Sequence, residues 1–139
     1  MLKRPEAHIA NTSSMGGFLP VPGQTVYGAS KATVKLLTEG IYAELLNTNV
    51  KVTVIYPGAI GTNIAANTGV SIAVPADAES SFKPLPADKA AQIIVDAIEQ
   101  DRYSVFVGSD AKFMDFIYRL NPKRAARYIY KQMKSLLPN

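Results

Sequence analysis

The chain has 139 residues, of which 47% are hydrophobic and 19% are charged. This balance is typical of a soluble globular domain with a substantial core, and it excludes an intrinsically disordered chain. The absence of cysteine excludes disulfide bonds and thiolate metal sites, and it is compatible with the cytoplasmic location that we expect. The first 14 residues contain no apolar core of a signal peptide, and no apolar run approaches the roughly 20 residues of a membrane span.

The positive charge of the chain is concentrated near its C-terminus. The formal net charge is +4, and residues 101–139 hold eight of the 15 basic residues but only three of the 11 acidic ones. Because the excess is local, composition does not support nucleic-acid binding, and we expect none. Basic and apolar residues alternate in "NPKRAARYIYKQMKSLLPN" at the C-terminus. We expect this helix to pack its apolar side on the domain, and a weak contact with an anionic membrane surface is the alternative.

The first half of the chain predicts a strand, a loop, a helix and a second strand. Residues 8–13 form a short strand candidate, and the glycines and prolines of residues 15–24 predict a loop. Apolar residues at helical spacing indicate a helix over about 25–47, with Thr25 as its N-cap. The apolar stripe of this helix consists of Val34, Leu37, Ile41 and Leu45. β-branched residues then predict a strand over 50–56, which a Pro-Gly pair ends.

The second half predicts a loop, a helix, a third strand and two further helices. Residues 61–85 are rich in Ala, Ser and Thr without a clear period, which indicates a loop with at most one short helix. A helix is predicted over 86–101, and a strand over 103–108. The inner face of that helix is expected to carry Ala90, Ile94, Val95 and Ile98. Two helices follow over about 110–120 and 122–137, separated by an Asn-Pro pair.

The order strand, helix, strand, helix, strand predicts an α/β fold. Parallel strands joined by right-handed helical crossovers produce this order. Three strands leave such a sheet incomplete, and no internal repeat or linker divides the chain.

Tyr27 and Lys31 stand four residues apart near the start of the predicted helix 25–47. Side chains at this spacing lie on the same helix face one turn apart. An ammonium group within about 4–6 Å favours the charged form of a phenol, so such a pair offers a proton donor and acceptor for interconversion of a carbonyl and an alcohol. Ser14 ends the preceding strand, and its hydroxyl could bind the same carbonyl oxygen. Taken alone, the Tyr-Lys spacing is more often an ordinary surface pair than a catalytic one.

Longer stretches around these residues resemble the short-chain dehydrogenase/reductase family. The resemblance is carried by "NTSSMGGFLPVPGQTVYGASK" at 11–31 and by "VTVIYPGAIGT" at 52–62. It includes the 13-residue interval from Ser14 to Tyr27, the "YGASK" signature and the Pro-Gly-x-Ile-x-Thr segment. The fold implied is part of a Rossmann-like doubly wound parallel sheet. The resemblance implies that the chain corresponds to roughly the C-terminal half of such an enzyme, and no G-x-x-x-G-x-G dinucleotide-binding string occurs in it.

The resemblance also implies a domain organisation and a site. Residues 1–108 would form the catalytic and nicotinamide side of the domain, and residues 109–139 a basic helical extension. Ser14 is implied to position the substrate, and Tyr27 to act as general acid and base. Lys31 is implied to assist Tyr27, and both are implied to contact the cofactor. The residues implied to line the nicotinamide and its neighbouring phosphate are Pro57, Gly58, Ile60 and Thr62.

The implied function is NAD(P)-dependent interconversion of a carbonyl and a secondary alcohol. NAD and NADP stay open as cofactors, because the residues that distinguish them would precede this chain. The substrate is a small molecule whose identity the sequence does not indicate, although residues 63–85 are expected to cover it. Their apolar members, which suggest a partly apolar pocket, are Ile64, Val70, Ile72, Ala73 and Val74.

Without a Gly-rich turn and its helix, the pyrophosphate and adenine lose their usual cradle. We therefore expect the 139-residue chain to lack dehydrogenase turnover by itself. We also expect an exposed edge on the strand 8–13, and a homo-oligomer of the full-length parent formed through the helix 25–47. Two alternatives stay open: a non-catalytic dimerisation or interaction partner that uses the same helix, and a relative with isomerase, epimerase or dehydratase chemistry.

Two other features have a structural interpretation. His8, the only histidine, lies at a strand start without a cluster of acids, so we expect a structural histidine and no metal site. Ser109 and Lys112 match the Ser-x-x-Lys spacing of serine acylases. Because Ser109 precedes a predicted helix, we expect it to be the N-cap of that helix.

Overall fold

The computed structural model describes residues 1–62 and 84–134, and in this part of the chain three parallel strands form the main sheet. The strands are β1 (Ala7–Thr12), β2 (Val50–Pro57) and β5 (Ser104–Val107), in the order β1-β2-β5. The predicted parallel α/β fold is confirmed, and β1 lies at one edge of the described sheet as expected. A second, two-stranded sheet of β3 (Ile60–Gly61) and β4 (Leu85–Pro86) was not predicted.

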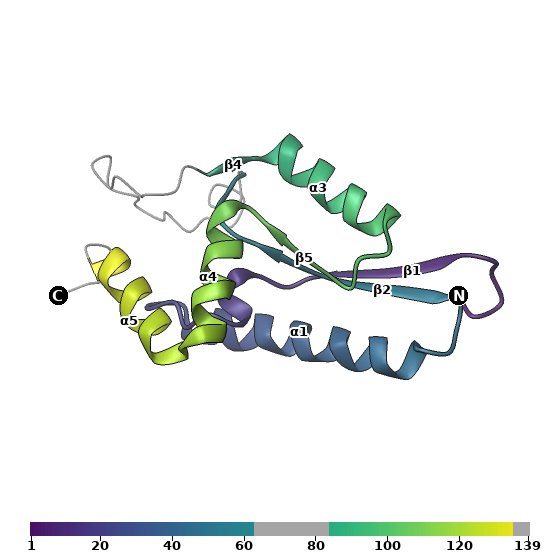
Figure 1. The fold of residues 1–139 in the computed structure, drawn as a ribbon, viewed down its shortest axis with the longest axis horizontal. Helices are drawn as coiled ribbons and strands as arrows, with labels where there is room; N and C mark the ends of the chain where they lie inside the picture. Colours follow the sequence, from purple (N-terminus) through teal and green to yellow (C-terminus); the bar gives the residue numbers. More distant parts are fainter. Residues whose placement is uncertain (63–83, 135–139) are drawn as a thin grey trace.

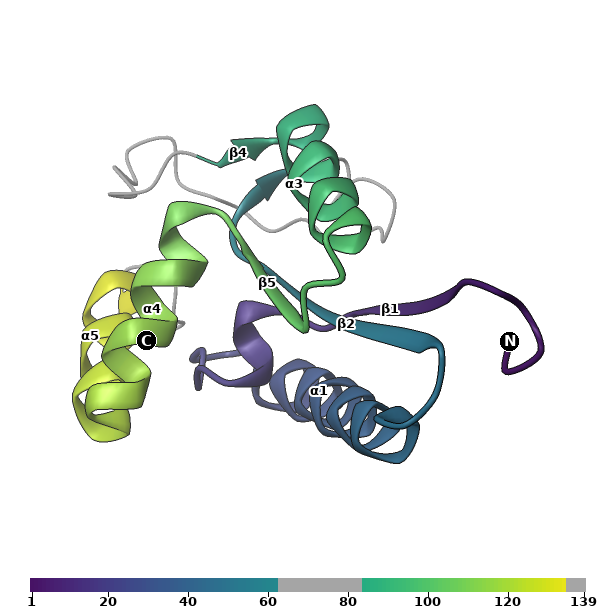
Figure 2. The same ribbon diagram turned by 45° about the vertical axis from the view of Figure 1, so that its right-hand side comes forward.

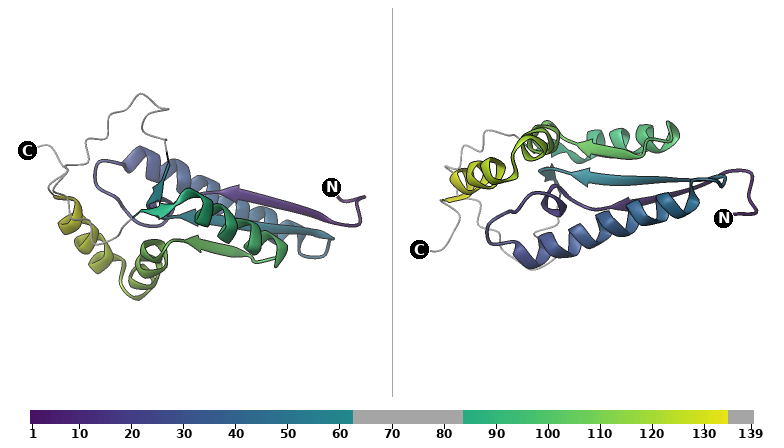
Figure 3. Two further views of the ribbon diagram at one scale, coloured as in Figure 1. Left: turned by 90° about the horizontal axis from the view of Figure 1, so that it is seen from above. Right: turned by 60° about the horizontal axis from the view of Figure 1, so that its bottom comes forward.

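Helices cover both faces of the sheet, as a doubly wound fold requires. α1 (Thr25–Leu45) lies on one face and α3 (Ala87–Glu99) on the other, with the strands between them (Figures 1 and 3). α4 (Ser109–Leu120) and α5 (Pro122–Met133) pack against each other at the end of the sheet where the strand arrows terminate (Figure 2). Among the described residues, no helix has the length and apolar character that crossing a membrane needs.

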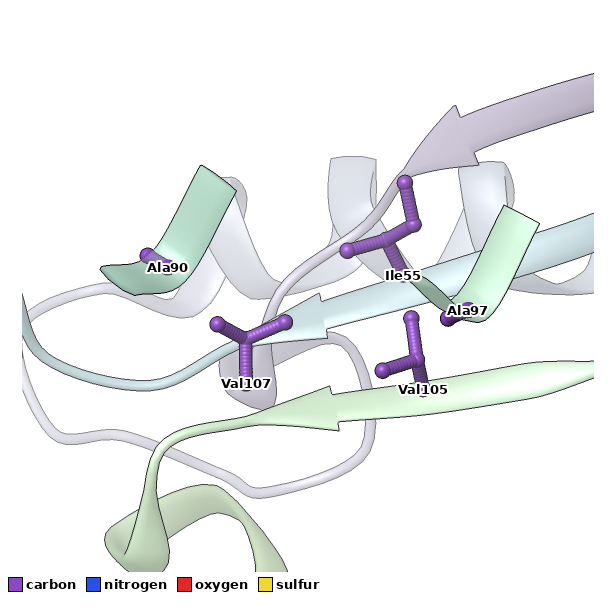
Figure 4. Packing of buried hydrophobic residues seen from close by; sticks show 5 residues of the cluster. All are labelled: Ile55, Ala90, Ala97, Val105 and Val107. Carbon is purple, nitrogen blue, oxygen red and sulfur yellow. The ribbon is translucent and has the colours of Figure 1, made fainter. Parts of the chain in front are cut away.

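The central strand β2 explains why the sheet is covered on both sides. All its residues from Val52 to Tyr56 are buried, which is typical of a parallel strand covered on two faces. Its register with β5 places Ile55 beside Val105 and Pro57 beside Val107. Toward α3 these strands bury one core cluster (Figure 4), which consists of Ile55, Ala90, Ala97, Val105 and Val107.

A second core cluster joins the C-terminal helices to the loop after β1. Leu19 from this loop is buried against Met114 of α4 and against Ala125 and Ile129 of α5. The expectation that the basic C-terminal helix packs its apolar side on the domain is therefore confirmed. Residues 135–137, which were predicted to continue this helix, lie outside the described part of the chain.

The inner faces of two helices differ from the prediction. In α1, Leu37 is 59% exposed, and the neighbouring Thr38 is fully buried instead. The Thr38 hydroxyl donates to the Val34 carbonyl and accepts a hydrogen bond from Asn11 Nδ2, so this polar group is satisfied on the inner face. In α3, Val95 is exposed, because the face that packs on the sheet is formed by Ala90, Ala97 and the neighbouring Ile93 and Ile94.

Two predicted N-caps are shifted by one residue. Gln24 occupies the N-cap of α1, because its carbonyl accepts the N–H of Gly28 and makes Thr25 the first helical residue. Gly108 occupies the N-cap of α4, so Ser109 is also helical and its side chain does not cap the helix. By contrast, the break before α5 follows the expected chemistry, with Asn121 Oδ1 accepting from the backbone N–H of Arg124.

Candidate active site

A 3-10 turn, η1 (Met15–Gly17), follows β1 and carries the first predicted site residue. Ser14 is its N-cap, and the Ser14 Oγ accepts a hydrogen bond of 3.1 Å from the Gly16 N–H. The buried Ser13 holds the turn in place, because its Oγ donates to the Lys31 carbonyl at 2.7 Å. The turn is thereby fixed against the first turns of α1.

Gly16 lies between Ser14 and Tyr27. A methyl group in place of its hydrogen would lie 3.4 Å from Tyr27 Cε1 and 3.7 Å from Ser14 Oγ. A methyl group at Gly28 would lie only 3.0 Å from the Gly16 carbonyl oxygen, so glycine at position 28 permits this close approach. The structure therefore places the serine hydroxyl and the tyrosine ring at one locus.

Lys31 completes the group one helical turn further along α1. Its Nζ lies 5.9 Å from the centroid of the Tyr27 ring and donates to the Thr12 carbonyl at 3.2 Å. The ammonium group therefore lies between the tyrosine ring and the end of β1. Tyr27 is 45% exposed, so its ring is accessible to a ligand. The three residues predicted to form a catalytic group are brought together.

The predicted nicotinamide segment, Pro57–Thr62, starts at the carboxyl end of β2. This end is next to the serine turn, because the Ser13 N–H donates to the Ile55 carbonyl at 2.8 Å. Gly58 N donates to the Val107 carbonyl, and the Ala59 carbonyl accepts from Leu85 N, both at 2.9 Å. Both predicted segments thus lie at the carboxyl edge of the parallel sheet, where open α/β sheets bind ligands.

A buried carboxylate holds this second segment, and the sequence analysis did not identify it. Asp110 in the first turn of α4 is only 7% exposed, and its Oδ2 accepts the Ala59 N–H at 2.6 Å. The available signal was an acidic residue directly after a glycine at the end of a strand. The neighbouring Ser109, and not Asp110, was predicted to have a role at the start of this helix.

Aromatic contacts connect the serine turn to the strands. The ring of Phe18 meets Tyr56 and Phe106 edge to face, at centroid distances of 5.7 and 5.9 Å. Tyr56 is 3% exposed, and burial, followed by the nearby Glu39 carboxylate, raises the pKa of its phenol. Tyr56 is therefore part of the core, whereas Tyr27 is exposed.

A cavity of about 740 Å³ lies on the flank of α1 beside the serine turn. Its lining is mostly apolar and includes Phe18, Val21, Gly28, Ala32 and Leu36. Tyr27 and Lys31 do not line it, but Gly16, which lies between Ser14 and Tyr27, does. The segment 63–85 was predicted to cover the substrate. Its residues 63–83, which include all five apolar residues named above, lie outside the described part of the chain.

His8 lies near the other end of β1 and has structural partners. Its Nε2 is 2.8 Å from Thr53 Oγ1, and its Nδ1 is 3.5 Å from Asp101 Oδ1. The prediction of a satisfied structural histidine is confirmed. In residues 1–62 and 84–134 no group of three or more His, Asp or Glu side chains is arranged to hold a metal ion.

Comparison with known proteins agrees with this geometry. The family model of short chain dehydrogenases matches residues 1–71. SadH, a provisionally assigned oxidoreductase of Mycobacterium tuberculosis, is 31% identical over 140 residues, which cover 96% of this chain and 51% of SadH. An uncharacterized oxidoreductase of Staphylococcus epidermidis is 35% identical over 100 residues, which cover 72% of this chain and 40% of that protein.

Solved structures show the same fold. A short chain dehydrogenase from Burkholderia cenocepacia in complex with NADP superposes with a TM-score of 0.73 at 23% identity, covering 89% of this chain and 47% of that one. A short-chain dehydrogenase from Sphingobium yanoikuyae in complex with NADPH gives 0.62 at 21% identity, covering 95% and 46%. The chain therefore has the Rossmann-like fold of these two proteins.

The chain belongs to the short-chain dehydrogenase family. It spans about half the length of SadH and less of the other curated relative described above, since 51% and 40% of these proteins are covered.

Proposed function

We propose that this chain is the catalytic and substrate-binding half of an NAD(P)-dependent oxidoreductase acting on a carbonyl or secondary alcohol. The observation that carries the proposal is the approach of Ser14 and Tyr27 on either side of Gly16, with the Lys31 ammonium beside the tyrosine ring. In the oxidising direction, a secondary alcohol and the oxidised cofactor yield a carbonyl, the reduced cofactor and one proton. When bound, the nicotinamide accepts or supplies the hydride.

The hydrogen-bond donors and acceptors that are still available assign a role to each side chain. The Ser14 Oγ accepts from Gly16 N, so its own O–H is available to donate to a substrate carbonyl oxygen. Tyr27 delivers the proton to the same oxygen during reduction and removes it during oxidation. Lys31 uses one of its three N–H bonds for the Thr12 carbonyl, which leaves two for ribose hydroxyls. These donors fit the nicotinamide ribose, with the Pro57–Thr62 turn at the same edge.

The adenine half of the cofactor lacks a comparable site in this sequence. No Gly-rich dinucleotide turn occurs among the 139 residues, so we propose that the chain by itself does not turn over substrate. NADP and NADPH in the two solved relatives support a nicotinamide dinucleotide for the complete enzyme, and NAD stays open.

The test joins this chain to the N-terminal half of a matching relative such as SadH. The hybrid is assayed with NAD and NADP against a panel of secondary alcohols, following the absorbance of the reduced nicotinamide. Tyr27→Phe should reduce kcat by about 10²- to 10⁴-fold, the usual contribution of general acid–base catalysis. Tyr42→Phe, on the same helix, is the matched control and should retain activity. A hybrid that oxidises alcohols equally well with Phe at position 27 would contradict the assignment of Tyr27.

A non-catalytic role as a binding partner is favoured by one further observation. Leu36 and Leu37 of α1 are 70% and 59% exposed, beside the cavity that Ala32 and Leu36 line. We propose that this side of α1 binds a second copy of the chain. Leu36→Glu should weaken self-association by about tenfold or more in light scattering, as for a central interface residue. Val95→Glu, at an exposed apolar position of α3, is the control and should not change it.

A further inference from the structure

The carboxylate of Asp110 lies between two turns that are far apart in the sequence. It accepts the backbone N–H of Ala59, 51 residues earlier in the chain, with its Oδ2. The residue is almost completely buried, although it carries an ionisable side chain. Buried carboxylates are uncommon unless polar partners compensate their charge. The burial of the Asp110 carboxylate therefore has a specific structural cause.

The glycines on both sides of the carboxylate show how closely it is enclosed. A methyl group at Gly58 would overlap both carboxylate oxygens, and one at Gly108 would overlap Oδ1. Gly108 also has a φ of 110°, a conformation that other residues rarely adopt. The Pro-Gly turn and the turn before α4 thus both lack side chains where the carboxylate lies.

The charge of Asp110 is compensated by backbone groups. Within residues 1–62 and 84–134, none of the ion pairs joins Asp110 to a cation; they involve Asp101, Glu39 and Asp115. Asp110 lies in the first turn of α4, where the positive end of the helix dipole favours an anion. With the Ala59 N–H, it forms a charge-assisted hydrogen bond, which is stronger than one between neutral groups.

We propose that Asp110 is the positioning residue of the nicotinamide turn. It anchors Ala59 to the start of α4, and the chain then leaves in a defined direction through Ile60 and Gly61, which pair with β4. Ile60 and Thr62, the remaining predicted contacts of the nicotinamide, follow this anchor directly. This inference rests on the proposed function, because it concerns how the same site binds the nicotinamide part of the cofactor.

The first measurement does not need catalysis. Hydrogen exchange at the Ala59 amide is followed by NMR in the 139-residue chain. Asp110→Ala should accelerate this exchange by about 10- to 100-fold, the range expected for a lost hydrogen bond to a charged acceptor. Asp110→Asn keeps an acceptor oxygen and should restore most of the protection. Asp88→Ala, which removes an exposed acid from the first turn of α3, is the matched control and should leave Ala59 unchanged.

A second pair of variants keeps the proposal testable if Asp110→Ala does not fold. Gly58→Ala pushes the carboxylate away without removing it, so it should also expose the Ala59 amide. In the double variant the added methyl group has no carboxylate to meet. Gly58→Ala should therefore be less harmful in the Asp110→Ala background than alone. If the effects of Gly58→Ala and Asp110→Ala on the free energy of unfolding are strictly additive, the inference that Gly58 encloses the carboxylate is wrong.

The closing measurement uses nicotinamide mononucleotide as the probe, titrated into the wild-type chain and the variants. Asp110→Ala should weaken its binding by about tenfold or more, and Asp110→Asn by less. If the wild type binds the probe and Asp110→Ala binds it equally well, the positioning role is wrong while the nicotinamide site stands. If the wild type does not bind it, the nicotinamide site and the role of Asp110 within it both fail.

Discussion

The two turns at the carboxyl edge of the sheet are held in different ways. Residues 13–17, called the catalytic turn after the role proposed above, are tied to α1 by the Ser13 hydroxyl and by close glycine contacts within about 20 residues of chain, and to Ile55 of β2 by the Ser13 N–H. The nicotinamide turn, residues 57–62, is tied to α4 by Asp110 across 51 residues. The side-chain anchor of the first turn thus comes from the next helix in the chain. The side-chain anchor of the second turn comes from a distant helix, so its geometry depends on the whole domain.

α4 nevertheless supports both turns. Its first turn supplies Asp110 to the nicotinamide turn, and its middle supplies Met114, which packs on Leu19 directly after the catalytic turn. The C-terminal helices are therefore part of the frame of the site. This shared support makes the comparison testable, because each variant below is expected to affect one turn more than the other.

The largest effect is expected for Leu19→Ala. Leu19 is only 1% exposed in the cluster formed with α4 and α5. Removing a buried leucine side chain typically costs about 2–5 kcal/mol of unfolding free energy, which urea denaturation would measure. Leu2→Ala, at a 63% exposed site outside α1, is the control and should stay within about 0.5 kcal/mol. Equal losses for the two variants would show that the catalytic turn does not depend on α4 and α5.

Gly17→Ala should disturb the catalytic turn alone. The added methyl group would lie 2.6 Å from Ser13 Oγ and 2.9 Å from the Lys31 carbonyl oxygen, both in a packed region. Overpacking of this kind costs about 1–3 kcal/mol. Gly40→Ala, where a methyl group meets no atom within 4 Å, should instead stabilise α1 by up to about 1 kcal/mol. The NMR chemical shifts of Gly58 and Ala59 should be unchanged in both variants. A change in these shifts would show that the two turns are coupled and behave as one unit.

Tyr56→Phe should remove a loss of stability at alkaline pH. Burial raises the pKa of the Tyr56 phenol above its ordinary value of 10.0, so the folded state keeps this proton to a higher pH than the unfolded chain. As the pH rises above about 10, unfolding releases the proton and stability falls by up to about 1.4 kcal/mol per pH unit. Denaturation midpoints at pH 8 to 11 would show this slope in the wild type and a smaller one in the variant. Parallel curves would contradict it.

The smallest effect is expected on the outer side of α5, which touches neither turn. Lys123, Arg127, Lys131 and Lys134 lie around Tyr130 on this side, and α5 contains no acidic residue. Its apolar side is already buried against the domain, so we propose only an electrostatic contact with anionic membrane surfaces. Each basic residue near such a surface contributes about 1 kcal/mol.

Cosedimentation with phosphatidylserine vesicles tests this contact. Lys123→Gln should reduce binding about fivefold, which corresponds to about 1 kcal/mol, and raised salt should abolish it. The control replaces Lys3 and Arg4, two exposed cations outside α5, by glutamate and should have little effect. Binding that is unchanged in the α5 variant would contradict the proposal.

The sequence alone determined the order of strands and helices along the chain and the family, and it predicted the residues of the catalytic group. Each of these depends on short-range geometry: a period of two or 3.6 residues, a Tyr and a Lys one helical turn apart, and a Pro-Gly pair that ends a strand. Ser14 could be placed beside Tyr27 because the family resemblance supplied the spacing of 13 residues. The roles of these residues stay predictions until the enzyme is assayed.

The tertiary structure alone decided which groups hold that site in place. Asp110 meets Ala59 because β2 and β5 pair in a register that places Pro57 beside Val107, and no local pattern encodes this pairing. Thr38 faces inward instead of Leu37 because the Asn11 amide on β1 is available to satisfy its hydroxyl. Contacts between residues far apart depend on the register and layering of the whole sheet, whereas the sequence pattern specifies only the elements that take part.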